Sequence, residues 1–207
     1  MSDVSHETGT GLREHILMVS RFLRSPSTVG AVSASSRAMA RMMVARIPVD
    51  RPVTVVELGP GTGAFTSAIV GRVAKGSRIL AIELEQAFVD RVRQKLPTVD
   101  IVRASAVDLE RLVAERHLAP VDHIVSGLPF ASLPMDMTRQ ILDGIEHVLR
   151  PGGTFTTFQY LHGYGLRPGR TFRQEMSRRM GAPPHRRLVL KNFPLAFILS
   201  WTRPARR

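Results

Sequence analysis

The feature that most constrains the fold is a short apolar segment that runs directly into three alternating glycines. Residues 55–63 are VVELGPGTG, and an apolar helical pattern follows at once. Glycine has no Cβ, so such a turn lets the backbone approach a bound ligand closely. A strand, a glycine-rich turn and a helix in this order are typical of nucleotide-binding α/β folds. The glycines alone are equally compatible with a plain tight turn.

From residue 53 onward, apolar runs of strand length alternate with helical stretches, the pattern of a parallel sheet built from βαβ units. Strands are predicted at 53–58, 78–83, 99–103, 121–126 and 154–160, with helices at 64–74, 86–96, 109–116 and 134–149. A basic helix at 171–180 precedes two strands, 187–191 and 195–202, expected as an antiparallel pair. The predicted fold class is α/β: a Rossmann-like, mostly parallel seven-stranded sheet with helices on both faces.

Two helices are predicted before the sheet. Residues 12–24 form an amphipathic helix, which Pro26 ends, with arginines opposite an apolar stripe. This helix suits the headgroup boundary of a membrane, and it can equally serve as a lid on the sheet. A second helix is expected to begin at Ser35 or Ser36, since either is a good N-cap. We therefore predict lid and membrane-interaction helices in residues 1–50 and a Rossmann-like domain with a basic C-terminal part in 51–207. The inward side chains expected on the second helix are Met39, Met42, Met43 and Ile47.

The formal net charge of +12 is concentrated at the C-terminal end. Residues 51–164 carry twelve Lys and Arg against twelve Asp and Glu, whereas residues 165–207 carry eleven against one. This distribution favours an acidic partner, either nucleic acid or an anionic membrane surface, over a solubilising tail. The absence of cysteine fits a reducing compartment. The polar first ten residues do not form a secretory signal, and no apolar run approaches the ~20 residues of a membrane span.

Two acidic residues make the glycine turn more specific. Glu57 precedes Gly59 by two residues, and Glu83 ends the second predicted strand. An acid at the second position can accept hydrogen bonds from both ribose hydroxyls of an adenosine group. Residues 57–63 and Glu83 resemble the first motif and the ribose-binding acid of Rossmann-like S-adenosylmethionine-dependent methyltransferases. The resemblance implies that Glu57 acts on the amino-acid end of S-adenosylmethionine and that the glycines line it.

Further matches to this family follow along the chain. Residues 105–108 occupy the position that contacts adenine, and the LRPGG of 149–153 resembles the turn before the fifth strand. No metal is expected, because the seven histidines are scattered. S-adenosylhomocysteine is the expected product. The residues implied to contact the cofactor are Ser36, Glu57, Gly59, Gly61, Gly63, Glu83, Leu84, Ser105, Ala106, Ser126 and Gly127.

The fourth strand ends in SGLPF, residues 126–130, at the edge where the acceptor is expected. This segment resembles the N-L-P-Y motif of ribosomal RNA adenine dimethyltransferases, in which the Asn amide orients an exocyclic amine. Gly127 stands at the Asn position and supplies no side chain. Methylation of RNA adenine is therefore the alternative function, beside a small-molecule acceptor. A binder without enzymatic activity is the least favoured class.

A second resemblance spans about residues 12–202. The RFL of 21–23, Pro26, the VGAV of 29–32, the serines at 35 and 36, and SGLP are similar to bacterial phospholipid N-methyltransferases. These convert phosphatidylethanolamine stepwise toward phosphatidylcholine. The resemblance implies a phospholipid substrate, an anionic membrane surface as partner, and a cytoplasmic location at the inner face of the cell membrane. It also implies that residues 29–36 pack over the cofactor, with Ser36 either touching it or only capping a helix.

An amine acceptor must lose a proton before it can attack a methyl group, and polar residues that could assist follow the fifth predicted strand. Tyr160 and Tyr164 are expected to surround the amine through cation–π contacts, and His162 to relay the proton or bind phosphate. A core tyrosine and a loop histidine are the alternative. Arg170 is the preferred phosphate ligand among the basic residues that follow. The expected substrate-binding residues are Leu128, Pro129, Phe130, Arg167 and Arg170.

Overall fold

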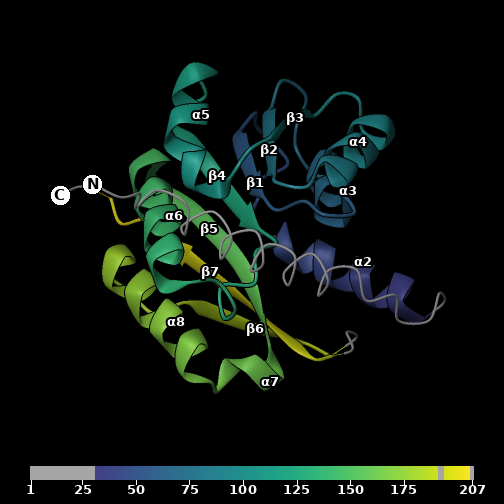
Figure 1. Ribbon diagram of the computed structural model, residues 1–207. Coiled ribbons are helices and arrows are strands. Elements are labelled where there is room, and N and C mark those ends of the chain that lie inside the picture. Colours follow the sequence, from purple (N-terminus) through teal and green to yellow (C-terminus); the bar gives the residue numbers. More distant parts are fainter. Residues whose placement is uncertain (1–30, 191–193, 206–207) are drawn as a thin grey trace, which may run out of the picture.

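The computed structural model describes residues 31–190 and 194–205, and it describes side chains from residue 37 onward. The predicted amphipathic helix at 12–24, Pro26 and residues 29–30 lie outside this part. The described chain forms one seven-stranded sheet in the order β3-β2-β1-β4-β5-β7-β6, with helices on both faces (Figure 1). The predicted Rossmann-like fold class is confirmed.

The sheet is parallel from β3 to β5 and antiparallel at β7. Neighbours β1 with β2 and β4, β2 with β3, and β4 with β5 pair in parallel. β7 runs antiparallel to β6, as the sequence pattern predicted, and it is also antiparallel to β5. The carboxyl ends of the parallel strands therefore share one edge of the sheet, where ligands bind in open α/β folds. The strands are β1 (Thr54–Leu58), β2 (Arg78–Glu83), β3 (Asp100–Arg103), β4 (Val121–Ser126), β5 (Leu149–Tyr160), β6 (His185–Val189) and β7 (Ala196–Thr202).

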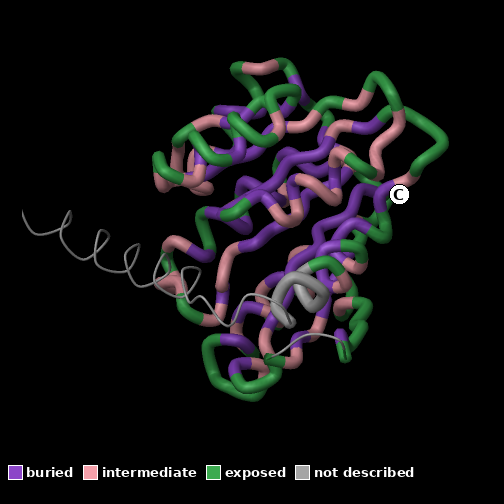
Figure 2. The backbone as a smooth tube through the Cα atoms, turned by 90° about the vertical axis from the view of Figure 1, so that its right-hand side faces the viewer, coloured by how far each residue is buried: buried purple, intermediate pink, exposed green. Residues whose placement is uncertain are grey.

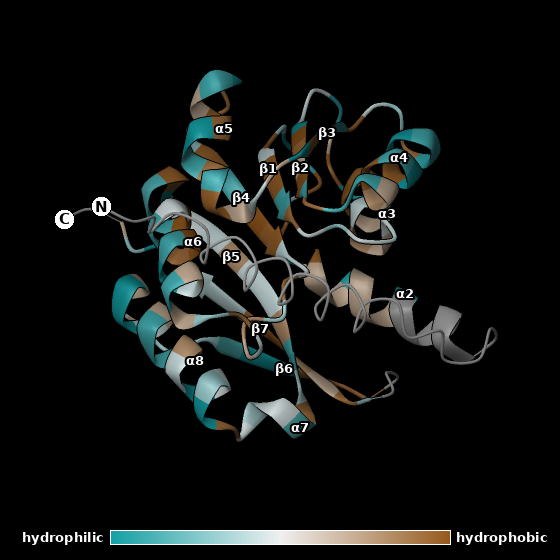
Figure 3. Cartoon of the chain, viewed as in Figure 1, coloured by the Kyte–Doolittle hydropathy of each residue, from teal (hydrophilic) through white to brown (hydrophobic). Residues whose placement is uncertain are grey.

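The two largest hydrophobic cores lie on opposite faces of the sheet, and a smaller cluster includes Val89 and Val92 of α4. The larger core packs β-strand side chains against α5, α6 and α8, and it includes Phe155, Phe172 and Trp201. The second core lies under α2 and α3 and includes Met43 and Phe158. Figure 2 shows the central strands buried, and Figure 3 shows hydrophobic residues concentrated in them. The helices are α2 (Ala31–Met43), α3 (Ala64–Val70), α4 (Gln86–Lys95), η1 (Ala106–Asp108), α5 (Leu109–Glu115), α6 (Met135–Val148), α7 (Leu161–Tyr164) and α8 (Arg167–Met180).

Several element boundaries differ from the prediction: α3 ends at Val70 rather than near 74, and β6 spans His185–Val189 rather than 187–191. α2 begins at Ala31, so the prediction that Ser35 or Ser36 caps it is wrong: both lie inside the helix. α8 begins at Arg167 rather than near 171, because Pro168 falls in the first turn, where its missing N–H costs nothing. β5 begins at Leu149, so the PGG turn is part of the strand.

Of the four inward residues predicted for the second helix, Met39 and Met43 are buried in α2 and Met42 is only partly buried. Ile47 is also buried, but it follows α2, which ends at Met43. None of the helices within residues 31–190 and 194–205 combines the length and apolarity that crossing a bilayer requires.

Candidate functional site

The glycine turn sits where the carboxyl ends of β1, β2 and β4 meet. Gly59, Gly61 and Gly63 have φ angles of +68°, +53° and +79°, a backbone region that side chains disfavour. The Gly59 N–H donates to the carbonyl of Ile82 at 2.9 Å, and the Gly127 N–H donates to the carbonyl of Leu58 at 2.8 Å. Backbone hydrogen bonds thus join the ends of three strands at one place.

The space around these glycines differs from one to the next. A Cβ at Gly127 would lie 2.4 Å from the carbonyl oxygen of Gly59, and one at Gly59 would lie 2.8 Å from Leu128 Cδ2. A Cβ at Gly61 would meet no described atom within 4 Å. The turn is therefore packed tightly against β4 at its base and open at Gly61, which is the arrangement a close-lying ligand requires.

Glu83 organises the neighbouring loops. Its Oε2 accepts a hydrogen bond from the Gly61 N–H at 2.9 Å, and its Oε1 accepts from the N–H groups of Leu84 and Glu85 at 2.8 and 3.0 Å. The residue is only 7% exposed. A carboxylate has about four lone-pair sites, so Glu83 orders the glycine turn and retains the capacity to accept a further hydrogen bond.

Glu57 is a buried carboxyl without a hydrogen-bond partner among the described residues. Burial raises the pKa of Glu57 to about 8; the adjacent Thr66 opposes this shift and the charge of Glu83 adds to it. The Thr66 hydroxyl lies nearby but also has no partner of hydrogen-bond geometry within the described part of the chain. Unsatisfied buried polar groups are uncommon in folded proteins. A ligand with a positively charged donor group would satisfy Glu57, so this residue fits the amino end of the expected cofactor.

The other predicted cofactor residues cluster around this turn. The Ala104 N–H donates to the Glu83 carbonyl at 2.9 Å, which places Ser105 and Ala106 beside β2. The Ser105 hydroxyl accepts from the Val107 N–H at 3.4 Å and caps η1. Ser126 is buried at the end of β4, and its hydroxyl accepts from the Leu128 N–H at 3.2 Å. The side chain of Ser36 lies outside the described residues.

The expected acceptor residues after β4 do not all lie at the surface of the site. Phe130 is 1% exposed and stacks on Phe172 of α8, with ring centroids 4.4 Å apart and planes at 10°. Its side chain therefore belongs to the larger core, which corrects its prediction as a substrate contact. Leu128 and Pro129 are partly buried and remain beside the glycine turn.

The structure separates the two tyrosines that were expected to surround the amine. Tyr160 packs against the second core and stacks on His162, with centroids 5.7 Å apart. Tyr164 packs against the larger core, on the other face of the sheet. The Arg173 guanidinium lies 3.7 Å from the Tyr164 ring centroid, and Arg186 donates to the Tyr164 hydroxyl at 3.1 Å. The prediction of a shared tyrosine cage is wrong, because protein cations already engage Tyr164.

Sequence analysis missed the contact that ties α8 to β5. Arg173 Nη1 donates to Gln159 Oε1 at 2.6 Å, and Gln159 Nε2 donates to the Gly169 carbonyl at 3.3 Å. A glutamine inside a buried strand was the available signal, since a buried amide requires partners. Arg170 donates from Nε to the Gly165 carbonyl at 2.9 Å, and both Arg170 and Arg167 are exposed at the start of α8.

Part of the basic C-terminal charge is neutralised within the fold. Arg179 pairs with Asp143 and Glu146 of α6, and Arg178 pairs with Glu175. Among the residues that the structure describes, no group of three or more side chains is arranged to bind a metal ion. The remaining exposed arginines lie at the start of α8 and on β6.

Comparisons with known proteins agree with this geometry. Residues 56–155 match the family model of a methyltransferase domain. The chain is 30% identical over 147 residues to the ornithine lipid N-methyltransferase of Singulisphaera acidiphila, spanning 70% of this chain and 77% of that protein. It is 33% identical over 89 residues to ribosomal RNA small subunit methyltransferase A of Acidobacterium capsulatum, spanning 43% of this chain and 29% of that protein.

The fold similarity extends over almost the whole chain. The crystal structure of the Burkholderia thailandensis 1,6-didemethyltoxoflavin-N1-methyltransferase, with bound 1,6-didemethyltoxoflavin and S-adenosylhomocysteine, superposes with a TM-score of 0.66. The two chains are 17% identical, and the alignment covers 99% of this chain and 93% of that one.

Proposed function

The chain belongs to the S-adenosylmethionine-dependent methyltransferases, and we propose that it methylates the amine of a membrane lipid. The observation that carries the proposal is the similarity to a lipid N-methyltransferase over 77% of that protein's length. The specific acceptor proposed is phosphatidylethanolamine, with its monomethyl and dimethyl forms, on the route to phosphatidylcholine. The enzyme would act at the inner face of the cell membrane.

The cofactor would be held by the residues around the glycine turn. S-adenosylmethionine supplies an electrophilic methyl group on a sulfonium sulfur. Glu57 would pair with the ammonium of its amino-acid end, because a buried carboxyl without a partner favours a cationic donor. Glu83 would accept from the ribose hydroxyls while it continues to hold the Gly61 N–H. Ser105 and Ala106 would lie against the adenine.

The chain's contribution to the reaction is to position the acceptor amine and to remove its proton. Burial raises the pKa of Tyr160, so its phenol stays protonated near neutral pH and is unsuited to act as the base. His162 stacks on Tyr160 and is exposed, and an imidazole can both accept and release a proton. We assign the ring of Tyr160 to the methylated ammonium and His162 to the proton.

An ornithine lipid is the second candidate acceptor, favoured by the name of the relative that the chain resembles over most of its length. Ribosomal RNA is disfavoured, because the chain spans only 29% of the ribosomal relative and has glycine where an adenine dimethyltransferase carries Asn. No side chain fits at Gly127 without movement of the Gly59 carbonyl.

The test is methyl transfer to vesicles of defined composition, with the lipid products resolved by mass spectrometry. Vesicles containing phosphatidylethanolamine should accumulate mono-, di- and trimethylated lipid in that order. Vesicles in which the amine is acetylated serve as the control and should gain no methyl group. Methylation of ornithine lipid alone would replace the proposed acceptor, and methylation of neither lipid would refute the proposal.

A further inference from the structure

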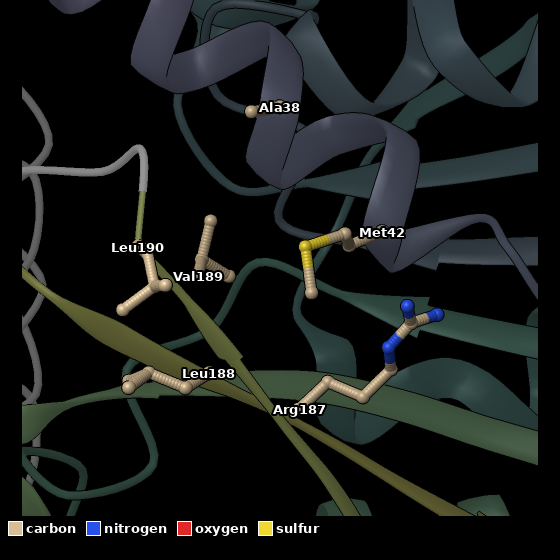
Figure 4. Close-up of a pocket in the computed structure, with 6 residues that line it drawn as sticks. All are labelled: Ala38, Met42, Arg187, Leu188, Val189 and Leu190. Atoms are coloured by element: carbon tan, nitrogen blue, oxygen red, sulfur yellow. The ribbon is translucent and has the colours of Figure 1, made fainter.

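An open groove lies between α2 and the edge strand β6, away from the glycine turn (Figure 4). Its volume is about 390 Å³, which is within the range of about 300–1,000 Å³ that is common for small-molecule sites. Since β6 is the last strand of the sheet, the groove is bounded by strand on one side and helix on the other. The lining residues are Ala38, Met42, Arg187, Leu188, Val189 and Leu190.

The lining is apolar except for one cation. Leu190 is 75% exposed, so a large aliphatic side chain at the groove stands in contact with solvent. Covering such apolar surface is favourable, because it is removed from water. Figure 4 shows the Arg187 side chain rising from β6 toward α2 beside Met42. The groove therefore suits a molecule that is apolar along most of its length and carries an anionic group.

Strand register connects the groove to the proposed acceptor site. Val189 of β6 pairs with Ala196 of β7, and Ala196 pairs with Tyr160 of β5, so the three residues form one row across the sheet. Their side chains belong to the same face, since Val189 and Ala196 are members of the second core and Tyr160 packs against it. Two strand spacings of about 4.8 Å place the groove about 10 Å from Tyr160.

The two consecutive arginines of β6 have different surroundings. Arg186 donates to the hydroxyl of Tyr164 at 3.1 Å, and Tyr164 packs against the larger core. Arg187 lines the groove on the face of the second core. Alternation along the strand therefore directs Arg187 to the groove, where a guanidinium can bind phosphate or carboxylate oxygens through paired hydrogen bonds.

We propose that the α2–β6 groove binds an acyl chain of the acceptor lipid and that Arg187 binds the anionic group of the same lipid. The inference rests on the proposed function, because it requires a lipid acceptor whose amine reaches Tyr160. The row of residues from Val189 to Tyr160 then sets the distance between the acyl chain and the headgroup of the bound lipid. The main alternative occupant is the amphipathic segment at 12–24.

The direct test is photocrosslinking of the full-length protein in detergent with a phosphatidylethanolamine that carries a diazirine on one acyl chain. Peptide mapping should find the label on Met42 or on residues 188–190, and unlabelled long-chain lipid should compete for it. Label found only elsewhere in the chain, including residues 1–30, would overturn the assignment. The readout needs no catalysis, so it tests the groove separately from the methyl-transfer reaction.

A kinetic test uses substitutions that fill the groove. Ala38→Trp and Met42→Trp, both on the α2 side of the groove, should raise KM for long-chain phosphatidylethanolamine in mixed micelles roughly tenfold and leave kcat near the wild-type value, because only ground-state binding is lost. For a short-chain analogue with the same headgroup, KM should change less than about twofold. Val49→Trp is the matched control, since Val49 is an exposed aliphatic residue outside the groove.

The outcomes separate the two proposals. The acyl-chain assignment would be refuted if the groove variants raised KM equally for long-chain and short-chain lipid, or if Val49→Trp raised KM as much as they do. Lipid methylation by the wild-type protein would still uphold the proposed function. Crosslinks in the groove without methyl transfer to any lipid would refute the proposed function and uphold lipid binding by the groove. Thermal unfolding of each variant is the control that tests whether the fold is retained.

Discussion

A Cβ atom on Gly127 would lie 2.4 Å from the carbonyl oxygen of Gly59, closer than a carbon and an oxygen can approach without a bond. The end of β4 therefore passes directly over the start of the glycine turn. The Gly127 N–H hydrogen bond to Leu58 holds this approach in place. A side chain at position 127 would therefore force the glycine turn to change its shape.

Substitution of Gly127 is expected to damage stability and cofactor binding together. Gly127→Ala should lower the free energy of unfolding by roughly 1–3 kcal/mol, because an overpacked contact forces the backbone to shift. Gly127→Asn should do the same without creating activity on RNA adenine. Gly165→Ala is the control, since a Cβ there meets no described atom within 4 Å. Urea unfolding and calorimetric titration of S-adenosylmethionine provide the measurements; a Gly127→Ala protein with wild-type stability and affinity would contradict the geometry.

Glu57 should make the cofactor-free protein less stable as pH rises. The carboxyl releases its proton near its ordinary pKa of 4.5 in the unfolded chain and near 8 in the folded chain. Between these values the folded state binds more protons, so the free energy of unfolding falls with increasing pH. Glu57→Gln removes this loss of stability. The free energy of unfolding of the variant, relative to that of the wild type, should therefore increase by on the order of 2–4 kcal/mol between pH 5 and 8.

Urea unfolding of both proteins at each pH measures this difference. Parallel curves for wild type and Glu57→Gln would show that Glu57 does not titrate between the folded and unfolded states as described. The same variant should bind S-adenosylmethionine more weakly, because the amide cannot pair with the ammonium as a carboxylate does.

Removal of the Glu83 carboxylate should weaken cofactor binding more than a surface charge change does. Glu83→Ala loses the acceptor for the Gly61, Leu84 and Glu85 N–H groups. Affinity for S-adenosylmethionine should fall roughly a hundredfold, since hydrogen bonds to charged groups contribute about 1.5–3 kcal/mol each. Asp90→Asn on the exposed side of α4 should stay within about twofold of wild type. Equal titration curves for the two variants would refute the role of Glu83.

Arg170 should contribute to binding of the lipid headgroup. Arg170→Gln is expected to raise KM for phosphatidylethanolamine roughly tenfold, the loss of about one charge-assisted hydrogen bond. Arg178→Gln is the control on the same helix, because Arg178 is occupied by Glu175. Initial rates on mixed micelles distinguish the two, and matching KM values would place headgroup recognition elsewhere.

The sheet could be predicted from sequence because its signals are local. Alternation of apolar runs and helical stretches located every strand and the antiparallel β7. The starts of α2 and α8 were placed wrongly because one residue type can occupy two structural positions. A serine can lie inside a helix or cap it, and a proline such as Pro168 can lie in the first turn of a helix or in a loop.

The positions of the predicted cofactor residues follow from local motifs, whereas the positions of the predicted acceptor residues depend on tertiary contacts. The predicted cofactor residues with described side chains meet at one edge of the sheet. The separation of Tyr160 from Tyr164 depends on how α7 turns after β5, and the burial of Phe130 depends on α8 arriving from forty residues away. Neither relationship is encoded in the spacing of the residues involved.

The central claim, that this methyltransferase acts on a lipid amine, is tested most directly by competition in a single reaction. Methyl-labelled S-adenosylmethionine is incubated with the full-length protein, phosphatidylethanolamine vesicles and bacterial ribosomal RNA, and the label is counted in each fraction. Label is expected in methylated lipid, with none in RNA above a heat-inactivated control. Label in RNA alone would contradict the lipid assignment and leave the fold and the cofactor site standing.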